Sequence, residues 1–350
     1  MNRLCYLLLG FLAGPLAAQV RWNAVLRQPA EWYATAEARA IADSVLLYQT
    51  AEDGWPKNTD MTAPPTAEYL AAIHSDHPGA TIDNGGTTTQ IAFLARVVTA
   101  TNGERHRAAV LHGLDYPLVS QYENGGWPQF YPLRPGYYTR STYTDNAMID
   151  VLGILRDVRD ARPPFAWVDI ARRKGAELAV ERAIGCILRT QCRRAGKLTA
   201  WCAQHDETTL APAWARNFEP PSLSGAESVG LVRVLMAVEN PTPEIIAAVV
   251  GAVAWFEAVK VRGLRVETFS NAEGQRDRRT VSDPDAPDLW ARFYELDTDR
   301  PIFTGRDRVI RYDFNEIERE RRAGYTYLGT WPDDLLAKEY PRWRAKHQLP

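Results

Sequence analysis

The chain lacks the local motifs that identify nucleotide-dependent enzymes and serine hydrolases. Its 350 residues contain no phosphate-binding P-loop, no dinucleotide fingerprint and no Gly-x-Ser-x-Gly elbow. A zinc site has little support, because neither His74 with His77 nor Cys202 with His205 is joined by a second pair of ligands. The side chains left to carry chemistry are carboxylates, amides and arginines.

Cysteine is scarce, with four in the chain, and Cys5 lies in the N-terminal apolar run. The other three, Cys186, Cys192 and Cys202, allow at most one internal disulfide. Cys192 and Cys202 flank one turn, so they are either bridged in an oxidising compartment or buried as free thiols. The sequence leaves both alternatives open.

Membrane-length hydrophobic runs are missing too. Residues 1–18 combine one basic residue, a short apolar run and small residues at its end, a pattern typical of an export signal. The run is too short, and too interrupted by glycine and proline, to span a bilayer comfortably. We therefore predict a signal peptide over 1–18, export to the periplasm or the exterior, and a single domain over 19–350.

Lysine is rare: only six of the 41 basic residues are lysine, and the others are arginine. Acidic residues number 43, and the net charge of −2 gives no general attraction to nucleic acid or acidic membranes. We expect neither as a partner, and we expect a monomer. A biased genome explains most of the arginines, but guanidinium groups also bind carboxylates in a planar fork that lysine cannot offer.

What the chain does contain is an internal repeat. A helix-like run ending in glutamine, a Gly-bearing turn and a tryptophan recur over 49–55, 121–127 and 191–201, so the tryptophans are 72 and 74 residues apart. A second element follows each copy and opens an apolar run at 83–86, 145–148 and 224–227. Each unit is long enough for two helices and a hairpin-like turn, and its polar residues can converge on one mouth.

Helical spacing predicts most of the elements, and strand signals are few and short. The repetition favours a mainly α fold, an α/α toroid of repeated helix pairs with short hairpin turns lining a cleft. An irregular segment is expected over 263–308. The expected helices are 32–49, one after 83–84 that ends at Gly103, 110–122 with a kink or early end at Pro117, 148–155, 168–190, one from a Ser224–Glu227 capping box to 236, a buried one over 244–261 and a charged one over 315–322.

Asp83 with Asn84, and Asp145 with Asn146, stand at the start of two equivalent helices. Asp and Asn are good N-caps, which explains one residue at each site. Each site offers two, however, and carboxylate and amide oxygens also suit a hard cation such as Ca²⁺. If the helix starts are neighbours, Asp83, Asn84 and Asp145 could share one ion and leave coordination positions for a ligand.

Aromatic turns and late arginines supply the other candidates. We expect the repeat tryptophans to pack in the core, and the adjacent Lys57 and Gln129 to contact sugar. Four arginines stand in loops or at helix ends: Arg216, Arg292, Arg306 and Arg322. Each alone is a candidate salt-bridge partner, but together on one cleft they would bind several carboxylates in bidentate fashion.

Several blocks of the sequence resemble the signature blocks of polysaccharide lyase family 10, the pectate lyases. They lie in order between about 31 and 331, over 81–90, 124–132, 143–148, 199–206, 219–228 and 292–307. The resemblance implies an α/α toroid, polygalacturonate as substrate, Ca²⁺ at the cleavage point, and β-elimination rather than hydrolysis.

The resemblance also implies roles for individual residues. Arg306, in Thr-Gly-Arg-Asp, takes the position of the catalytic base. Asp83, Asn84 and Asp145 are associated with the metal and the uronate carboxylate. The residues expected to bind substrate are Arg216, Arg292, Arg322, Lys57, Gln129 and His205, with Arg322 less secure because Arg321 adjoins it.

Other functions fit the residues without the resemblance. An inverting glycoside hydrolase would use two carboxylates that flank a water, such as Asp83 with Glu123 or Asp145. A non-catalytic protein that binds oligogalacturonides would keep the arginines and show no turnover. An arginine base is unusual, since the guanidinium pKa lies above about 12. We expect Arg292 and calcium beside Arg306 to lower it, and activity to favour alkaline pH.

Overall fold

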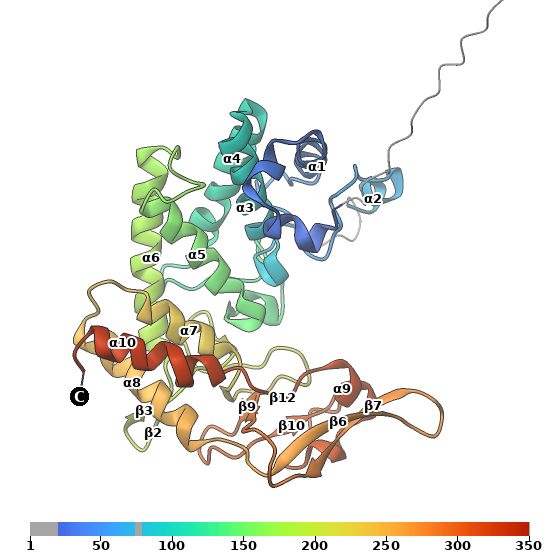
Figure 1. Ribbon diagram of the computed structural model, residues 1–350, viewed down its shortest axis with the longest axis vertical. Helices are drawn as coiled ribbons and strands as arrows, with labels where there is room; N and C mark the ends of the chain where they lie inside the picture. Colours follow the sequence, from blue (N-terminus) through green and yellow to red (C-terminus); the bar gives the residue numbers. More distant parts are fainter. Residues whose placement is uncertain (1–19, 74–78, 350) are drawn as a thin grey trace, which may run out of the picture.

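The computed structural model describes residues 20–73 and 79–349 of the chain (Figure 1). The predicted signal peptide over 1–18 lies outside the described residues, and so do His74 and His77. In the described part, no helix has both the length and the apolar character needed to cross a bilayer.

Two rows of helices form most of the molecule (Figure 1). In one row α1, α4, α6 and α8 are neighbours in that order, and in the other α3, α5 and α7 are. The pairs α3–α4, α5–α6 and α7–α8 pack against each other, which confirms the α/α toroid. The helices are α1 (Ala36–Leu46), α2 (Ala67–Ile73), α3 (Thr88–Thr101), α4 (Glu104–Ser120), α5 (Ala147–Arg159), α6 (Ile170–Thr190), α7 (Glu227–Met236), α8 (Pro243–Ala258), α9 (Arg319–Gly324) and α10 (Tyr340–Lys346).

The repeated glutamines tie each turn to the next unit. Each side chain donates from Nε2 to one carbonyl oxygen in its own turn and one in the following helix of the first row. The pairs are Gln49 with Asp53 (2.9 Å) and Ala109 (3.1 Å), Gln121 with Gly125 (3.1 Å) and Ala179 (2.9 Å), and Gln191 with Thr199 (2.8 Å) and Ala248 (2.9 Å). Glutamine thus provides two donors where backbone carbonyls need partners.

The repeated tryptophans are buried, as predicted, and each indole N–H donates to a carbonyl of the preceding helix. The pairs are Trp55 with Val45 (2.9 Å), Trp127 with Pro117 (2.7 Å) and Trp201 with Ile187 (2.7 Å). Trp290 makes the same bond to Phe256 in α8 (2.9 Å) and is 1% exposed. It is a fourth copy of the turn, which the sequence analysis missed.

Short antiparallel pairings join each turn to the unit before it. Thr81 forms a bridge with Phe130, β1 (Ser141–Thr142) pairs with β4 (Gln204–His205), and β5 (Leu223–Ser224) pairs with β9 (Phe293–Tyr294). In each case the segment just before a helix of the second row lies against the segment just after the next tryptophan. The pairings therefore set the starts of α3, α5 and α7 side by side.

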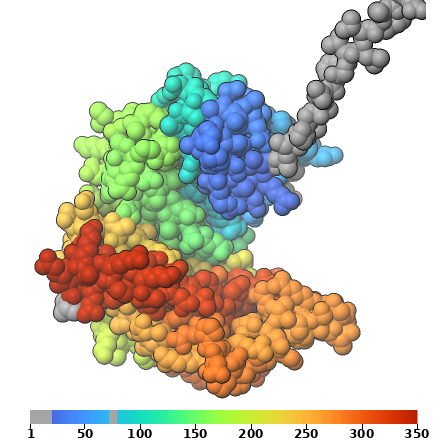
Figure 2. Space-filling view, viewed as in Figure 1, coloured from blue at the N-terminus to red at the C-terminus, as the bar shows by residue number. Residues whose placement is uncertain are grey.

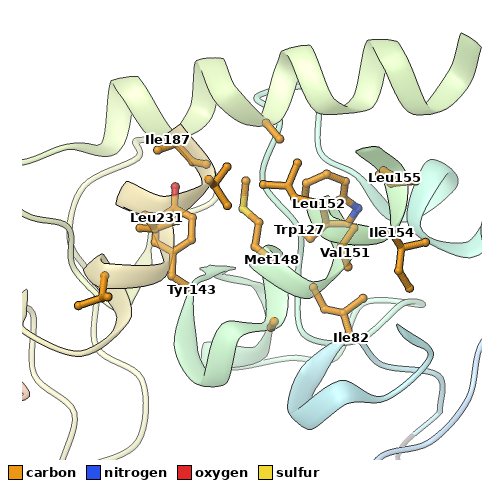
Figure 3. Close-up of a cluster of buried hydrophobic side chains, with 14 of the residues drawn as sticks. Ile82, Trp127, Tyr143, Met148, Val151, Leu152, Ile154, Leu155, Ile187 and Leu231 are labelled. Atoms are coloured by element: carbon orange, nitrogen blue, oxygen red, sulfur yellow. The ribbon is translucent and has the colours of Figure 1, made fainter. Parts of the chain in front are cut away.

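The core lies between the two rows of helices. In α5 the buried residues recur at helical spacing, including Met148, Val151, Leu152 and Leu155. Figure 3 shows this stripe packed with Trp127 and Tyr143 and with side chains from the neighbouring elements. One cluster of buried side chains continues from Val25 to Trp343, so the two ends of the described chain share a core.

The segment expected to be irregular contains the longest strands of the described chain. β6 (Leu264–Ser270) and β7 (Arg276–Ser282) form a hairpin that projects from the C-terminal part of the molecule (Figure 1). The prediction for 263–308 was wrong here because nearly all of the hairpin is exposed or only half-buried and it carries charged residues on both faces. Without a buried face there is no apolar alternation to recognise. The remaining strands have two residues each: β2 (Arg193–Arg194), β3 (Lys197–Leu198), β8 (Trp290–Ala291), β10 (Phe303–Thr304), β11 (Ile310–Arg311) and β12 (Leu328–Gly329).

Three helix predictions also need correction. α4 continues through Pro117 to Ser120 rather than ending early. α8 is not buried all round, since Val250 is 40% exposed. The charged segment 315–322 is not one helix, because Ile317 is extended between a 3₁₀ turn, η6 (Phe314–Glu316), and α9. The other short turns are η1 (Trp22–Arg27), η2 (Ala30–Ala34), η3 (Asp83–Gly85), η4 (Tyr137–Thr139), η5 (Thr144–Asn146) and the π-helical η7 (Leu335–Glu339).

The three cysteines in the described part of the chain, Cys186, Cys192 and Cys202, are all free thiols. Cys202 is buried and Cys192 is partly so. Burial raises the pKa of both thiols, that of Cys192 to about 12. Of the two alternatives that the sequence leaves open, the structure shows free thiols.

Gln191→Ala should destabilise the fold, because it removes the donor shared by Thr199 and Ala248. Leaving buried carbonyl groups unpaired costs about 1–3 kcal/mol each, so we expect a loss of at least about 2 kcal/mol. Urea denaturation followed by circular dichroism measures it. Gln275→Ala, in the exposed turn of the β6–β7 hairpin, is the control and should change the unfolding free energy little. Equal midpoints for the two variants would contradict the bridging role.

Candidate functional site

Three acidic residues stand at the starts of the second-row helices. Asp83 lies in η3 before α3, Asp145 in η5 before α5, and Glu227 is the first residue of α7. The pKa of Asp145 is raised, first by desolvation and then by the Glu227 and Asp83 carboxylates. The pairing of the turns has therefore brought three carboxylates from distant parts of the sequence into one row.

The local backbone explains why Asp and Asn occupy the first two starts. Asn84 (φ 51°) and Asp145 (φ 51°) are in the left-handed region, which Asn and Asp tolerate better than most residues. Neither Asp-Asn pair caps its helix through a side chain in the described structure, so the N-cap explanation does not hold. At the third start Glu227 N donates to Ser224 Oγ (3.0 Å), but the predicted capping box is only half formed. α7 begins at Glu227 with Ala226 as its N-cap, and the Ser224 backbone N–H donates to the Trp201 carbonyl instead of the Glu227 carboxylate.

The row of acids has a cation at each end and none at its centre. Lys57 Nζ is ion-paired with Asp83 Oδ2, and Arg292 Nη1 with Glu227 Oε1 (2.8 Å). Within residues 20–73 and 79–349, no hydrogen bond or ion pair engages the Asp145 carboxylate. Arg292 and Arg216 act on it only at longer range, opposing the rise in its pKa. Asp145 is thus the acid that is open to a ligand.

Three guanidinium groups surround one aromatic ring beside this row. The guanidinium carbons of Arg321, Arg216 and Arg306 lie 4.4, 5.0 and 5.6 Å from the centroid of Phe218. Cations are attracted to the face of such a ring. Carboxylates also hold the group together, because Glu320 is ion-paired with both Arg306 and Arg321, and Glu219 with Arg216. The structure therefore brings Arg216 and Arg306 together, as the resemblance predicts, and adds Arg321 and Phe218.

Tyr325 continues this aromatic platform. It packs edge-to-face on Phe218 (5.2 Å between centroids), and Arg292 lies over its ring at 4.9 Å. Its hydroxyl donates to Glu219 Oε1 (2.9 Å), and Glu219 Oε2 accepts from Arg216 Nε (2.8 Å). Burial, followed by Glu219, raises the pKa of Tyr325. The phenol therefore stays a protonated donor that fixes the carboxylate holding Arg216.

Arg306 stands at the exposed edge of this group. Its Nε and Nη2 lie 3.0 and 3.1 Å from the Glu320 carboxylate oxygens, and its backbone N–H donates to Glu318 Oε1 (2.6 Å). A side chain at Gly305 would collide with the Glu318 carboxylate, since a Cβ there would lie 1.9 Å from Oε2. Glu320 raises the pKa of Arg306 and outweighs the lowering by Arg216. The neighbours therefore act against the lowered pKa that the sequence analysis expects.

Arg322 is not part of this group. Its Nη2 is ion-paired with Asp277 Oδ2 in β7 (2.6 Å), and other donors bond the carbonyl oxygens of Ile317 and Arg278. This network attaches α9 to the β6–β7 hairpin, so the Arg322 guanidinium has a structural role. The hypothesis that Arg322 binds substrate therefore has no free guanidinium to support it. Its neighbour Arg321 lies over Phe218 instead and is ion-paired with Glu320.

His205 and Gln129 are also displaced from the expected role. His205 is 0% exposed, and its Nδ1 lies 2.8 Å from the Leu210 carbonyl oxygen. Burial lowers the pKa of the imidazole to about 4, so the ring is neutral. Gln129 is 3% exposed, and its backbone carbonyl accepts from Ile82 N (3.2 Å). Both residues build the pairings between turns, and a bound sugar has little or no surface to contact on them.

The carboxylates are of the chemical type that binds calcium, but they are too few to enclose an ion by themselves. Asp83 Oδ1 is buried without a hydrogen-bond partner, and Asp145 is open, so two hard oxygen ligands are available. Among the described residues, no group of three or more His, Cys, Asp or Glu could hold a metal by itself. A calcium ion here would need further oxygens from Asn84, from water and from a bound carboxylate.

The acid row and the arginines come from opposite parts of the chain. The acids belong to helix starts in the body of the toroid, and Arg306 and Arg321 belong to the C-terminal part with α9 (Figure 1). Figure 2 shows the surface hollowed between the blue-to-green part and the orange part. An open carboxylate thus lies near several guanidinium groups, an arrangement suited to a ligand that is itself rich in carboxylates.

Comparisons with known proteins agree with this picture. The family model described as pectic acid lyase matches residues 49–336. A solved structure of the family 10 polysaccharide lyase from Cellvibrio cellulosa has 33% identity and a TM-score of 0.76, covering 93% of this chain and 94% of that one. An aspartate-to-alanine mutant of the family 10 lyase from that organism, in complex with trigalacturonic acid, has 32% identity and a TM-score of 0.74, covering 94% and 99%.

No curated protein sequence matches the chain. The family model nevertheless spans most of its length, and the structural relatives share its architecture from end to end. The chain belongs to the pectic acid lyases, within family 10 of the polysaccharide lyases.

Proposed function

We propose that this lyase cleaves polygalacturonate by calcium-assisted β-elimination, with an arginine as general base, and releases 4,5-unsaturated oligogalacturonates. The observation that carries the proposal is the open Asp145 carboxylate between two ion-paired acids, beside Arg216, Arg292, Arg306 and Arg321. The relative solved with trigalacturonic acid supports an oligogalacturonate as the ligand. Export, predicted from residues 1–18, would bring the enzyme to a polysaccharide outside the cell.

β-Elimination requires that the C5 proton leave and that the C4–O bond break. The C5 proton is barely acidic while the adjacent carboxylate is negative, because its removal adds charge to the same group. Arg216 and Arg292 would neutralise that carboxylate and stabilise the enolate-like charge as it develops. Calcium held by Asp83, Asn84 and Asp145 would add Lewis-acid polarisation of the carboxylate.

The base must stand close to the sugar whose carboxylate is bound near Asp145. The resemblance assigns this role to Arg306, and we carry that assignment forward. Arg216 is the second candidate, because its charge directly lowers the pKa of Asp145. Arg306 interacts with Arg216, whose charge lowers the pKa of Arg306, and so is connected to Asp145 only indirectly. Each guanidinium is held by a glutamate in the free enzyme, Glu320 for Arg306 and Glu219 for Arg216. Either would therefore have to leave its glutamate and lose a proton to solvent before it could accept the C5 proton of the substrate.

A glycoside hydrolase remains the second function worth testing. The raised pKa of Asp145 is what the general acid of such an enzyme needs. Asp83, the partner carboxylate proposed for it, is however engaged by Lys57. The two reactions differ in product, because only elimination creates a double bond conjugated with the carboxylate.

Incubation with polygalacturonate and calcium should produce a rise in ultraviolet absorbance as the unsaturated product forms. Excess chelator should suppress the rise, because the protein ligands alone cannot replace the cation, and added calcium should restore it. Magnesium at equal concentration is the control, since it demands a smaller, more regular site. Reducing sugars without new absorbance would identify a hydrolase, and full activity in chelator would exclude the metal from the reaction.

Arg306→Ala and Arg306→Lys should each lower kcat by about 10²–10⁴, the usual contribution of a general base, while oligogalacturonate binding survives. Arg216→Ala tests the second candidate in the same assay. Arg233→Ala is the matched control, because Arg233 also forms a bidentate pair, with Glu339, on an exposed surface. Turnover close to wild type in Arg306→Ala, with turnover abolished in Arg216→Ala, would transfer the base role to Arg216.

A further inference from the structure

A cavity of about 700 Å³ adjoins the catalytic cleft. Its walls are η1, the turn over 56–60 and the segment 84–90 that opens α3. The volume lies within the range of about 300–1,000 Å³ common for ligand pockets. Residues of η1 come before residue 49, where the match to the family model begins, so this wall lies outside the matched segment.

Two arginines without partners line this cavity. Arg21 and Arg27, at the two ends of η1, are exposed, and neither guanidinium group has a hydrogen bond or an ion pair within the described residues. The acidic residue in the described lining is Asp60, whose Oδ1 accepts from Thr62 N (2.9 Å) and Oγ1 (2.6 Å). The lining is therefore basic, and its two arginines are free to bind a carboxylate, whereas its lysine, Lys57, is ion-paired with Asp83.

An aromatic side chain stands between the two arginines. Trp22 lines the cavity, is half-buried, and packs edge-to-face on Phe93 of α3 (5.9 Å between centroids, 78° between planes). Phe93 is 0% exposed, so it holds the indole from the side of the core. A held, partly exposed indole beside polar groups suits the apolar face of a sugar ring.

The cavity and the catalytic cleft share a border. Lys57 and Asn84 line the cavity, and Lys57 is ion-paired with Asp83 at the end of the acid row. A chain whose uronate lies at Asp145 can therefore continue past Asp83 into the cavity without leaving the protein surface. A linear uronan carries one carboxylate on every sugar, which matches a path with cations at intervals.

We propose that this cavity is a distal subsite that binds the extension of an acidic sugar chain, with Arg21 and Arg27 on uronate carboxylates and Trp22 beneath a sugar ring. The inference rests on the proposed function, because the chain that enters the cavity is the one cleaved at the acid row. The proposal predicts that longer substrates bind more tightly than short ones, because they also contact residues that take no part in the reaction.

The test is the double variant Arg21→Gln/Arg27→Gln, assayed on long polygalacturonate and on trigalacturonate. KM for the long substrate should rise about five- to tenfold, the size expected for losing two exposed ion pairs, with kcat unchanged. Kinetics on trigalacturonate, which is too short to fill both sites, should stay at the wild-type values. Arg105→Gln/Arg342→Gln removes the same charge from exposed positions on α4 and α10 and should behave as wild type.

An unchanged KM on the long substrate would overturn the subsite, and so would an equal rise on both substrates or in the control variant. Failure of the proposed function is separable, because it would show as no unsaturated product from any protein. In that case calorimetric titration of long polygalacturonate into wild type and the double variant decides the question. Weaker binding in the variant alone would uphold the subsite, and equal binding would exclude it.

Discussion

The antiparallel pairing between successive turns is the constraint on which the site depends. Each pairing is only one or two residues long, yet it fixes the register between a segment before one helix and a segment after the next tryptophan. A slip of one residue would turn the side chains at the helix starts to the other face. The buried tryptophans resist such a slip, because each is anchored by packing and by an indole hydrogen bond.

Electrostatic balance follows from that register. Three carboxylates side by side repel one another, and the structure compensates at both ends of the row with Lys57 and Arg292. At the centre, desolvation and then repulsion by the Glu227 and Asp83 carboxylates raise the pKa of Asp145. The centre is therefore where a divalent cation, or a ligand that carries one, gains most from binding.

The repeat and the helices were readable from the sequence because Gln, Gly and Trp perform the same task in each unit. The fourth turn was missed for a physical reason: Trp290 follows Trp201 by 89 residues, since the β6–β7 hairpin is inserted before it. The repeat also suggested that Asp83 and Asp145 could meet at neighbouring helix starts, and that the arginines could gather on one cleft. The roles given to Arg216, Arg292 and Arg306 came from the resemblance to a family, not from spacing.

Residues whose role depends on side-chain direction could not be predicted. Arg321 and Arg322 are adjacent on a helix of six residues, and only the fold decides which faces Phe218 and which faces Asp277. His205 was expected to bind substrate because it stands in a block, 199–206, that resembles the family. Its place in a buried pairing gives it zero exposure, and sequence contains no measure of that.

Glu219, Glu227 and Glu320 each hold an arginine of the site in the free protein. An arriving uronate must therefore compete with carboxylates already in place, and a small monovalent acid gains little from exchanging one such group for another. A ligand with several carboxylates on one chain loses its translational entropy only once on binding. After the first carboxylate is bound, each further one can pair with an arginine without that loss. In the proposed function, the internal glutamates would thus favour binding of polymers over the many simple anions in their surroundings.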